Sequence, residues 1–175
     1  KDTSGVMIIA RNDKAHRFLS DQFKERKTSK IYRALVRGAP PDSGTINRPL
    51  GRHIKDRKKQ AVRYDGGRPS VSHYEVKERF GHVAALAEIR IETGRTHQIR
   101  VHMSSIGHGV LADQTYGRSK HPRAEASIAR QALHAAILAI NHPASGQRLR
   151  FEAALPEDLE DAIQTLKSLT KKDIR

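Results

Sequence analysis

Residues 93–103, TGRTHQIRVHM, place two arginines and two histidines among apolar side chains. Imidazole rings can bind a metal ion, and a guanidinium group can hold a carboxylate or a phosphate through two parallel hydrogen bonds. The spacing of His97 and His102 disfavours metal, because a helix turns residues five apart onto different faces and a helical zinc pair needs a spacing of four. The chain has no cysteine to complete a ligand set. We therefore expect no metal site here.

Arg95 is the residue of this segment best placed to bind an anion. Gly94 permits a tight turn, and Arg95 then stands at the start of a helix, where free backbone N–H groups attract negative charge. Chemistry alone leaves two interpretations level, an anionic partner or a structural salt bridge. Arg100 lies further along the helix, and its periodicity is compatible with a surface position.

A strand and a helix must position this segment. Residues 82–92, HVAALAEIRIE, alternate between apolar and polar types, which predicts a half-buried antiparallel strand that leads into the turn. Ile99 and Met103 then recur at helical spacing, with Thr96 as the expected N-cap and Gly107 as the helix end. The segment therefore lies at a strand-to-helix junction.

The rest of the chain shows a mixed pattern of strands and helices. Further strands are predicted at residues 5–10, 29–38, 71–77 and 145–155. Helices are predicted at residues 12–26, 123–141 and 156–169. Because several adjacent strands have no helix between them, the sheet should be largely antiparallel and the fold class α+β. A length of 175 residues fits one domain, residues 1–175.

Positive charge is the strongest bulk property of the chain. It has 33 Lys and Arg against 19 Asp and Glu, a net charge of +14, which predicts a polyanionic partner such as nucleic acid. No apolar run is long enough to span a membrane. The absence of cysteine and of a signal-peptide pattern leads us to expect a cytoplasmic protein, and we expect a monomer.

Residues 46–70 are predicted to form a basic arm, an exposed loop or hairpin flanked by glycine and proline. Six basic residues and one acid fall between positions 51 and 63. A solvated surface loop is the plain interpretation, but the large positive charge favours contact with nucleic acid. The expected phosphate contacts are Arg52, Lys55, Arg57, Lys58, Lys59 and Arg63.

The segment TGRTHQIRVHM, followed by GHGVLADQTYG, resembles the signature of the RluA-type pseudouridine synthases, which modify RNA. Six other segments resemble motifs of the same family, in the same order along the chain. They are DTSGVMIIAR (2–11), KIYRALVRG (30–38), INRPLGRHIKDRKKQAV (46–62), GRPSVSHYEV (67–76), RQALHA (130–135) and HPASGQRLRFEAALPED (142–158). The resemblance covers essentially the whole chain, so chance similarity is very improbable.

The resemblance implies the pseudouridine synthase fold, a mixed, largely antiparallel bent sheet flanked by helices. It implies isomerisation of uridine to pseudouridine in structured RNA, most of all ribosomal RNA of the large subunit, with transfer RNA as another substrate class. It implies no cofactor. The alternative from another class is a non-catalytic RNA-binding or ribosome-assembly protein on the same fold.

The resemblance also implies roles for single residues. Tyr32 matches the family tyrosine that packs on the flipped uracil, and Arg95 matches the arginine that pairs with the catalytic aspartate. That aspartate, in the family's HRLD motif, would fall immediately before Lys1, so the chain is expected to be an N-terminally incomplete catalytic domain that is inactive alone. Asp2 occupies a spacer position. The expected neighbours of the site are Thr96, Gln98, Ile99 and Leu133, with His97 as a further RNA contact.

Overall fold

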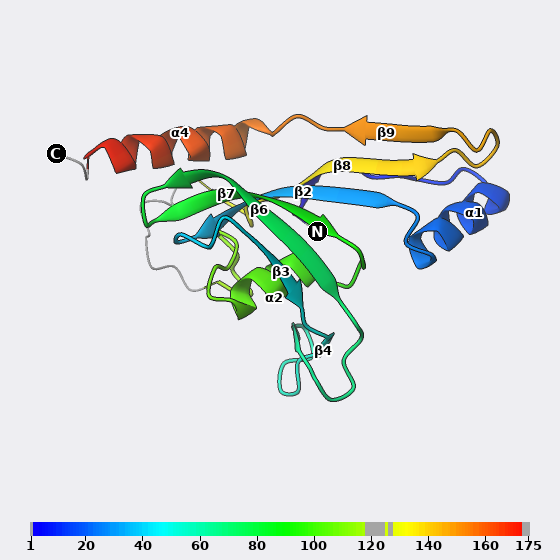
Figure 1. The fold of residues 1–175 in the computed structure, drawn as a ribbon, viewed down its shortest axis with the longest axis horizontal. Coiled ribbons are helices and arrows are strands. Elements are labelled where there is room, and N and C mark those ends of the chain that lie inside the picture. Colours follow the sequence, from blue (N-terminus) through cyan, green and yellow to red (C-terminus); the bar gives the residue numbers. More distant parts are fainter. Residues whose placement is uncertain (1, 118–124, 126–127, 173–175) are drawn as a thin grey trace.

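The structure is a computed structural model that describes residues 2–117, 125 and 128–172. Its described part contains a seven-stranded sheet in the order β1-β8-β2-β7-β6-β3, with β9 paired to β8 (Figure 1). Apart from the parallel pair of β1 and β8, all its pairings are antiparallel. The α+β class with a largely antiparallel sheet is confirmed.

The elements have the following bounds. The strands of the sheet are β1 Ser4–Gly5, β2 Ser29–Arg37, β3 Ser43–Asn47, β6 Val71–Phe80, β7 Ala84–Ile91, β8 Leu133–Asn141 and β9 Arg148–Glu152. A separate two-stranded sheet pairs β4 Leu50–Arg52 with β5 Gln60–Val62. The helices are α1 Asp13–Lys24, α2 Gln98–Ser105 and α4 Glu157–Lys172. No helix in the described ranges has the length and apolarity that crossing a membrane requires.

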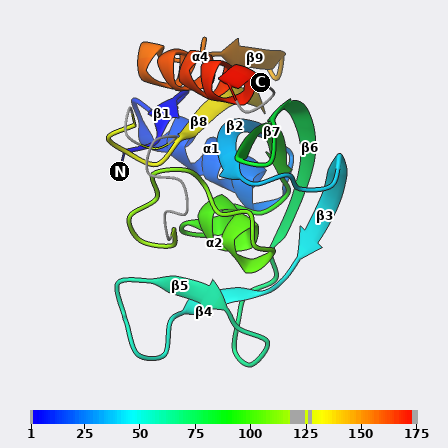
Figure 2. The ribbon, with the colours of Figure 1, turned by 90° about the vertical axis from the view of Figure 1, so that its left-hand side faces the viewer.

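One core joins the centre of the sheet to α2 and α4, which lie on opposite sides of the strands in both views (Figures 1 and 2). Leu35, Ala87 and Ile89 of the central strands are almost fully buried, as are Met103 of α2 and Leu166 of α4. Burial of these apolar side chains fixes where β7 ends and α2 begins. It thereby fixes the turn at residues 93–97.

The predicted helix at residues 123–141 is wrong over residues 128–141, because 128–132 are irregular and Leu133–Asn141 form strand β8, whereas Glu125 is helical. This strand has β2 on one side and β1 and β9 on the other, and most of its side chains are buried. A strand buried on both faces shows no alternation of apolar and polar residues, so its sequence looks like that of a buried helix. Residues 123–124 and 126–127 of the predicted range lie outside the described residues.

The predicted buried strand at residues 5–10 is also wrong. Strand β1 contains only Ser4 and Gly5, and the N–H of Val6 adds one more bond to the carbonyl of Ala135 at 2.9 Å. Beyond it, Val6, Ile8 and Ala10 pack against a small apolar cluster, whereas Met7 and Ile9 are 80% and 76% exposed. Val6, Ile8 and Ala10 are therefore half-buried on one side of the segment, and Met7 and Ile9 face solvent on the other.

The expected hairpin within residues 46–70 is present. Its strands β4 and β5 pair in register from Leu50 with Val62 to Arg52 with Gln60. The hairpin projects away from the main sheet, beyond α2 (Figure 2). It is therefore an arm, and its side chains are a mixture of exposed and half-buried ones.

Candidate active site

One cavity of about 450 Å³ brings together the residues that the sequence singled out for catalysis. Tyr32 enters it from β2, Arg95 from the turn before α2, and Thr3 from the segment before β1. Ile99 and Leu133 line the same cavity. Its volume of about 450 Å³ lies within the usual range for small-molecule sites.

Tyr32 is half-buried in this cavity. It pairs with Ile89 of β7 on one side and Ala135 of β8 on the other, next to a register shift in the pairing with β8. Burial raises the pKa of the Tyr32 phenol. The side chain is therefore a neutral phenol at physiological pH.

Gln98 holds the turn that carries Arg95. Its Oε1 accepts hydrogen bonds from Thr93 Oγ1 at 2.7 Å and from the N–H of Arg95 at 3.1 Å. Its Nε2 donates to the carbonyl of Val71 at 2.9 Å and to Ser72 Oγ at 3.0 Å. The Gln98 amide is buried, and both its oxygen and its nitrogen make hydrogen bonds. These bonds hold the turn against β6. The sequence indicated Gln98 only as a neighbour of the site.

His97, not Thr96, is the N-cap of α2, so the predicted Thr96 cap is wrong. His97 has φ 56°, in the left-handed region, and makes no side-chain cap hydrogen bond. That conformation costs energy for a residue with a Cβ and is typical of functional sites. Its Nδ1 lies 2.7 Å from the hydroxyl of Tyr116, and burial is the main cause that lowers the pKa of His97. Its ring lines the cavity, and RNA contact by His97 stays a prediction.

Arg100 is buried, which overturns the surface position that its periodicity allowed. Its Nε and Nη2 donate to Asp113 Oδ2 at 2.6 Å and Oδ1 at 2.7 Å, and its guanidinium lies 5.0 Å from the ring centroid of Tyr116. Burial acts to raise the pKa of Asp113, but hydrogen bonds from Arg100 and from backbone N–H groups outweigh it and leave that pKa lowered. The sequence gave no signal for this pair, because its members are thirteen residues apart in different elements.

Arg95 has no carboxylate partner among the residues that the structure describes. Its Nε makes one long hydrogen bond, 3.4 Å, to the carbonyl of Pro69. Partial burial and the nearby cations Arg68 and Arg26 lower the pKa of Arg95. Of the two interpretations left open by chemistry, this geometry favours an anionic partner.

The expected phosphate contacts lie on the arm. Arg52, Lys55, Arg57 and Lys58 are exposed, whereas Lys59 and Arg63 are half-buried. Lys59 Nζ lies 3.5 Å from Asp56 Oδ2, and Arg63 Nη1 donates to the carbonyl of Arg52 at 3.3 Å. These six residues face solvent in varying degree, and their contact with RNA stays a prediction.

Tyr116 connects the arm to the cavity. Its hydroxyl accepts the N–H of Gln60, in β5, at 2.8 Å, and the same oxygen contacts His97 Nδ1. The carbonyl of Tyr116 accepts a hydrogen bond from Ser104 Oγ at 3.1 Å. Strand β5 of the arm and the start of α2 are therefore held by one side chain that the sequence did not single out.

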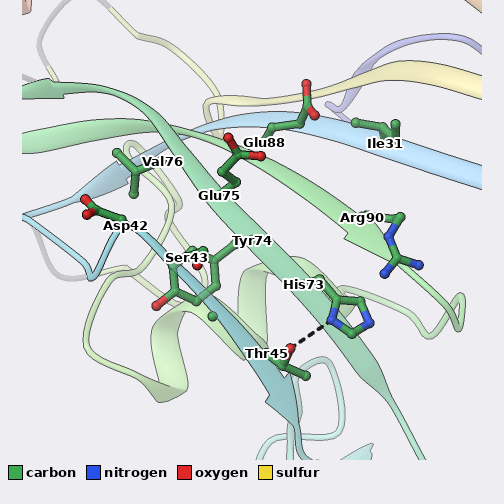
Figure 3. A pocket seen from close by; sticks show the side chains of 11 residues that line it. Ile31, Asp42, Ser43, Thr45, His73, Tyr74, Glu75, Val76, Glu88 and Arg90 are labelled. Carbon is green, nitrogen blue, oxygen red and sulfur yellow. Dashed lines mark hydrogen bonds between the residues drawn. The ribbon is translucent and has the colours of Figure 1, made fainter.

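A larger cavity, about 670 Å³, is elsewhere on the sheet, over β3, β6 and β7 (Figure 3). Its lining includes the carboxylates of Asp42, Glu75 and Glu88, beside Arg90 and His73. None of the sequence-predicted site residues lines it. Since its carboxylates repel phosphate, the smaller cavity around Tyr32 and Arg95 is the better candidate site for a polyanionic substrate.

Comparisons with known proteins agree with the motifs. Residues 1–105 match the family model described as RNA pseudouridylate synthase. The chain is 46% identical over 166 residues to an uncharacterized RNA pseudouridine synthase of Chloroflexus aurantiacus, an alignment covering 95% of this chain and 51% of that protein. It is 47% identical over 165 residues to ribosomal large subunit pseudouridine synthase D of Zymomonas mobilis, covering 91% and 52%.

A solved structure is similar as well. Human RNA pseudouridylate synthase domain containing 1 superimposes with a TM-score of 0.70 at 28% identity, covering 91% of this chain and 74% of that one. The chain spans about half the length of the curated relatives it matches.

Proposed function

Since this chain belongs to the RNA pseudouridylate synthase family, we propose that it isomerises uridine to pseudouridine within RNA. The observation that carries the proposal is the single cavity lined by Tyr32, Arg95 and the segment before β1. In the proposed mechanism, the side chains of Tyr32 and Arg95 must act on the same uridine, so they must lie in one cavity.

The reaction breaks the glycosidic bond from N1 of uracil, turns the base, and joins C5 to the sugar. A proton leaves C5 and one is returned to the ring, so the product is an isomer and no cofactor is consumed. We propose that the carboxylate that starts the reaction is that of the aspartate in the family's HRLD motif. Arg95 would keep that carboxylate ionised and oriented, because an opposite charge at contact distance favours the charged form.

Tyr32 would hold the flipped uracil in this mechanism. As a neutral phenol it can stack on the base and donate a hydrogen bond. If Tyr32 also takes the C5 proton, it must give up its own hydroxyl proton in the same step, since its raised pKa keeps the phenolate scarce at neutral pH.

The substrate proposed here is ribosomal RNA of the large subunit, modified in the cytoplasm. Relatives named ribosomal large subunit pseudouridine synthase D support this choice, and the net charge of +14 fits a polyanion. Structured RNA is recognised through its shape and through unstacked bases that can be splayed out. Transfer RNA is the competing substrate.

The test is tritium release from RNA labelled at C5 of uracil, using the protein expressed from its complete reading frame. We expect release from large-subunit ribosomal RNA, and its loss in an Arg95→Ala variant. Binding of ribosomal RNA without any release from ribosomal or transfer RNA would reject the isomerase and favour a non-catalytic RNA-binding role.

A further inference from the structure

Lys30 is a buried cation, and no ion pair joins it to a carboxylate within the part of the chain that the structure describes. It is 7% exposed, and its Nζ lies 5.7 Å from the centroid of the Phe23 ring. Burial, with repulsion from Arg26 and Arg95, lowers the pKa of Lys30. Burying a charge that is not paired with a carboxylate is costly, so an anion bound beside Lys30 would be stabilising.

Thr28 lies two residues before Lys30 and is also unsatisfied. It is 8% exposed, and its buried Oγ1 has no hydrogen-bond partner among the described residues. Buried hydroxyl groups in folded proteins nearly always have a partner. The buried hydroxyl of Thr28 is therefore a second, independent observation that points to a polar ligand at the same place.

Both residues line one cavity of about 300 Å³. Three cations, Arg26, Lys30 and Arg90, contribute to its wall, with one carboxylate, Glu92. That carboxylate is already engaged by His73 at 2.7 Å and lies 3.9 Å from Arg26. The wall thus carries a positive excess and free donors, which suit a small tetrahedral anion better than a base.

The cavity adjoins the candidate active site. Ile91 lines both cavities, and Arg95, which lines the larger of the two, contributes to the repulsion felt by Lys30. Lys30 and Tyr32 are two residues apart on β2, so they share a face and stand about 6.6 Å apart along the strand. A nucleotide whose base reaches Tyr32 would carry its phosphates past Lys30.

We infer that Arg26, Thr28 and Lys30 form a phosphate subsite, filled by a phosphodiester next to the target uridine. Lys30 Nζ and the Thr28 hydroxyl donate to phosphate oxygens, and Arg26 adds its charge at the rim. The identity of the phosphate as part of the RNA rests on the proposed function. The preference for a phosphate group rests on the cavity itself.

The decisive variant is Lys30→Met, which removes the charge and keeps an unbranched apolar side chain. We expect its melting temperature to rise above that of the unchanged protein, because the unpaired buried cation is gone. We expect its affinity for ribosomal RNA to fall about tenfold, the usual size for a lost charged hydrogen bond. The matched control is Lys14→Met on the exposed face of α1, which changes net charge equally and should show neither effect.

A lysine that only supports the fold would give a lower melting temperature and unchanged affinity. Unchanged RNA affinity in Lys30→Met would overturn the inference. Thr28→Val provides a second route, since it keeps the shape of the side chain and removes only the hydroxyl. It too should bind RNA more weakly without loss of melting temperature, and unchanged binding would count against the subsite.

Two further measurements separate the sources of the phosphate. Inorganic phosphate, compared with chloride at equal ionic strength, should raise the melting temperature of the unchanged protein and not of Lys30→Met. One neutral methylphosphonate linkage beside the target uridine should weaken RNA binding by the unchanged protein and have no added effect on Lys30→Met. Stabilisation by inorganic phosphate with no effect of the methylphosphonate would reject the RNA linkage and leave free phosphate as the ligand.

If neither measurement shows a response, the phosphate subsite is rejected. The failure of the proposed function is distinguishable, because an absence of tritium release leaves the effect of inorganic phosphate on the melting temperature unchanged.

Discussion

Arg95 and Arg100 stand in the same short segment, yet their guanidinium groups are used differently. Arg100 makes two short hydrogen bonds to a buried carboxylate and lies over the ring of Tyr116. Arg95 makes one long bond to a backbone carbonyl and otherwise borders the cavity. Arg95 is therefore the arginine available to a substrate or catalytic anion, and Arg100 is part of the support beneath it.

Replacing Tyr32 by phenylalanine should separate binding from chemistry. Tyr32→Phe keeps the ring that stacks on uracil but has no hydroxyl, so RNA affinity should stay within about twofold while turnover falls by about 10²–10⁴. Tritium release and filter binding measure the two quantities. Tyr64→Phe, at an exposed position of the arm, is the control, and equal turnover in the two variants would remove Tyr32 from the mechanism.

Removing Arg100 should destabilise the fold strongly. Arg100→Met leaves Asp113, 2% exposed, as an unpaired buried carboxylate, which typically costs about 3–5 kcal/mol. Urea unfolding should show this loss, and Asp113→Asn in the same chain should recover part of it. Lys77→Met, which removes an exposed partner of Glu75, should change stability little; an equal loss there would contradict the assignment.

Stability should depend on pH through His102. This ring is fully buried, with Nε2 donating to the carbonyl of Arg48 at 3.0 Å and Nδ1 accepting from Ser72 Oγ at 2.8 Å. Burial is the main cause that lowers the pKa of His102 below its ordinary 6.5. Below pH 6.5 the unfolded chain therefore binds a proton at His102 that the folded protein does not. The free energy of unfolding should decrease as the pH is lowered below 6.5.

Urea unfolding at pH 7.5 and pH 5.5 measures that fall. We expect a smaller difference between the two pH values in His102→Asn than in the unchanged protein. His82→Asn, at an exposed position, should keep the full difference. If the two variants behave alike, His102 is not the group responsible.

At the scale of elements, the short strand β1 forms part of the cavity wall, because Ser4 and Gly5 both line the cavity. It pairs in parallel with β8 through Ser4 with His134 and Gly5 with Ala135. Ser4 Oγ also hydrogen-bonds His134 Nδ1 at 2.9 Å. Because Thr3 lines the cavity just before β1, the pairing decides where the preceding chain runs.

Gly5→Ala should displace β1 and abolish turnover. A Cβ at Gly5 would lie 2.1 Å from the carbonyl oxygen of Ala135, and φ is +111°. The backbone must shift, which moves Thr3 and whatever precedes it away from Arg95. Gly146→Ala is the matched control, because φ there is +72° and nothing lies within 4 Å of the added Cβ.

Circular dichroism and tritium release would distinguish the two glycine variants. The control should show only the strain of a left-handed residue with a side chain, about 1–2 kcal/mol, and keep its turnover. Normal turnover in Gly5→Ala would mean that β1 does not position the active site.

The elements also show which parts of this fold can be predicted from sequence. Strand β7 was predicted from its alternation, because one of its faces is apolar and the other polar. Strand β8 was not predicted as a strand. Both of its faces are largely buried, and such burial removes the alternation of apolar and polar residues that distinguishes a strand from a helix. Whether each strand could be predicted therefore depended on how many of its faces are buried in the sheet, and not on how apolar its sequence is.

The residues of the candidate site also fall into two groups, those that the sequence predicted and those that it missed. Tyr32 and Arg95 were predicted as site residues from the family resemblance, and both line one cavity, whereas their catalytic roles stay predictions. Asp113 and Tyr116 were missed, since they act through contacts with Arg100, His97 and the arm that only tertiary packing creates. The left-handed φ of His97 was missed for the same reason, since packing imposes it against local preference.

At the scale of the whole molecule, the chain has a net charge of +14, and six of its basic residues lie on the arm between positions 51 and 63. The arm projects beyond α2 (Figure 2) and is tied to the cavity through the Tyr116 hydroxyl. Cations on such an arm can hold RNA phosphates without taking part in the chemistry. Affinity and turnover should therefore be separable by changes to the arm.

The triple change Lys55→Gln, Arg57→Gln and Lys58→Gln tests that separation. Each single-strand phosphate contact contributes about 0.7 to the slope of log affinity against log salt, so the slope should fall by about 2. Turnover at saturating RNA should be unchanged, because these exposed residues lie outside the cavity. The control carries Lys14→Gln, Arg17→Gln and Lys24→Gln on α1, an equal loss of charge. An equal fall in slope for both variants would mean that RNA responds to the net charge of the molecule and that the arm makes no direct phosphate contact.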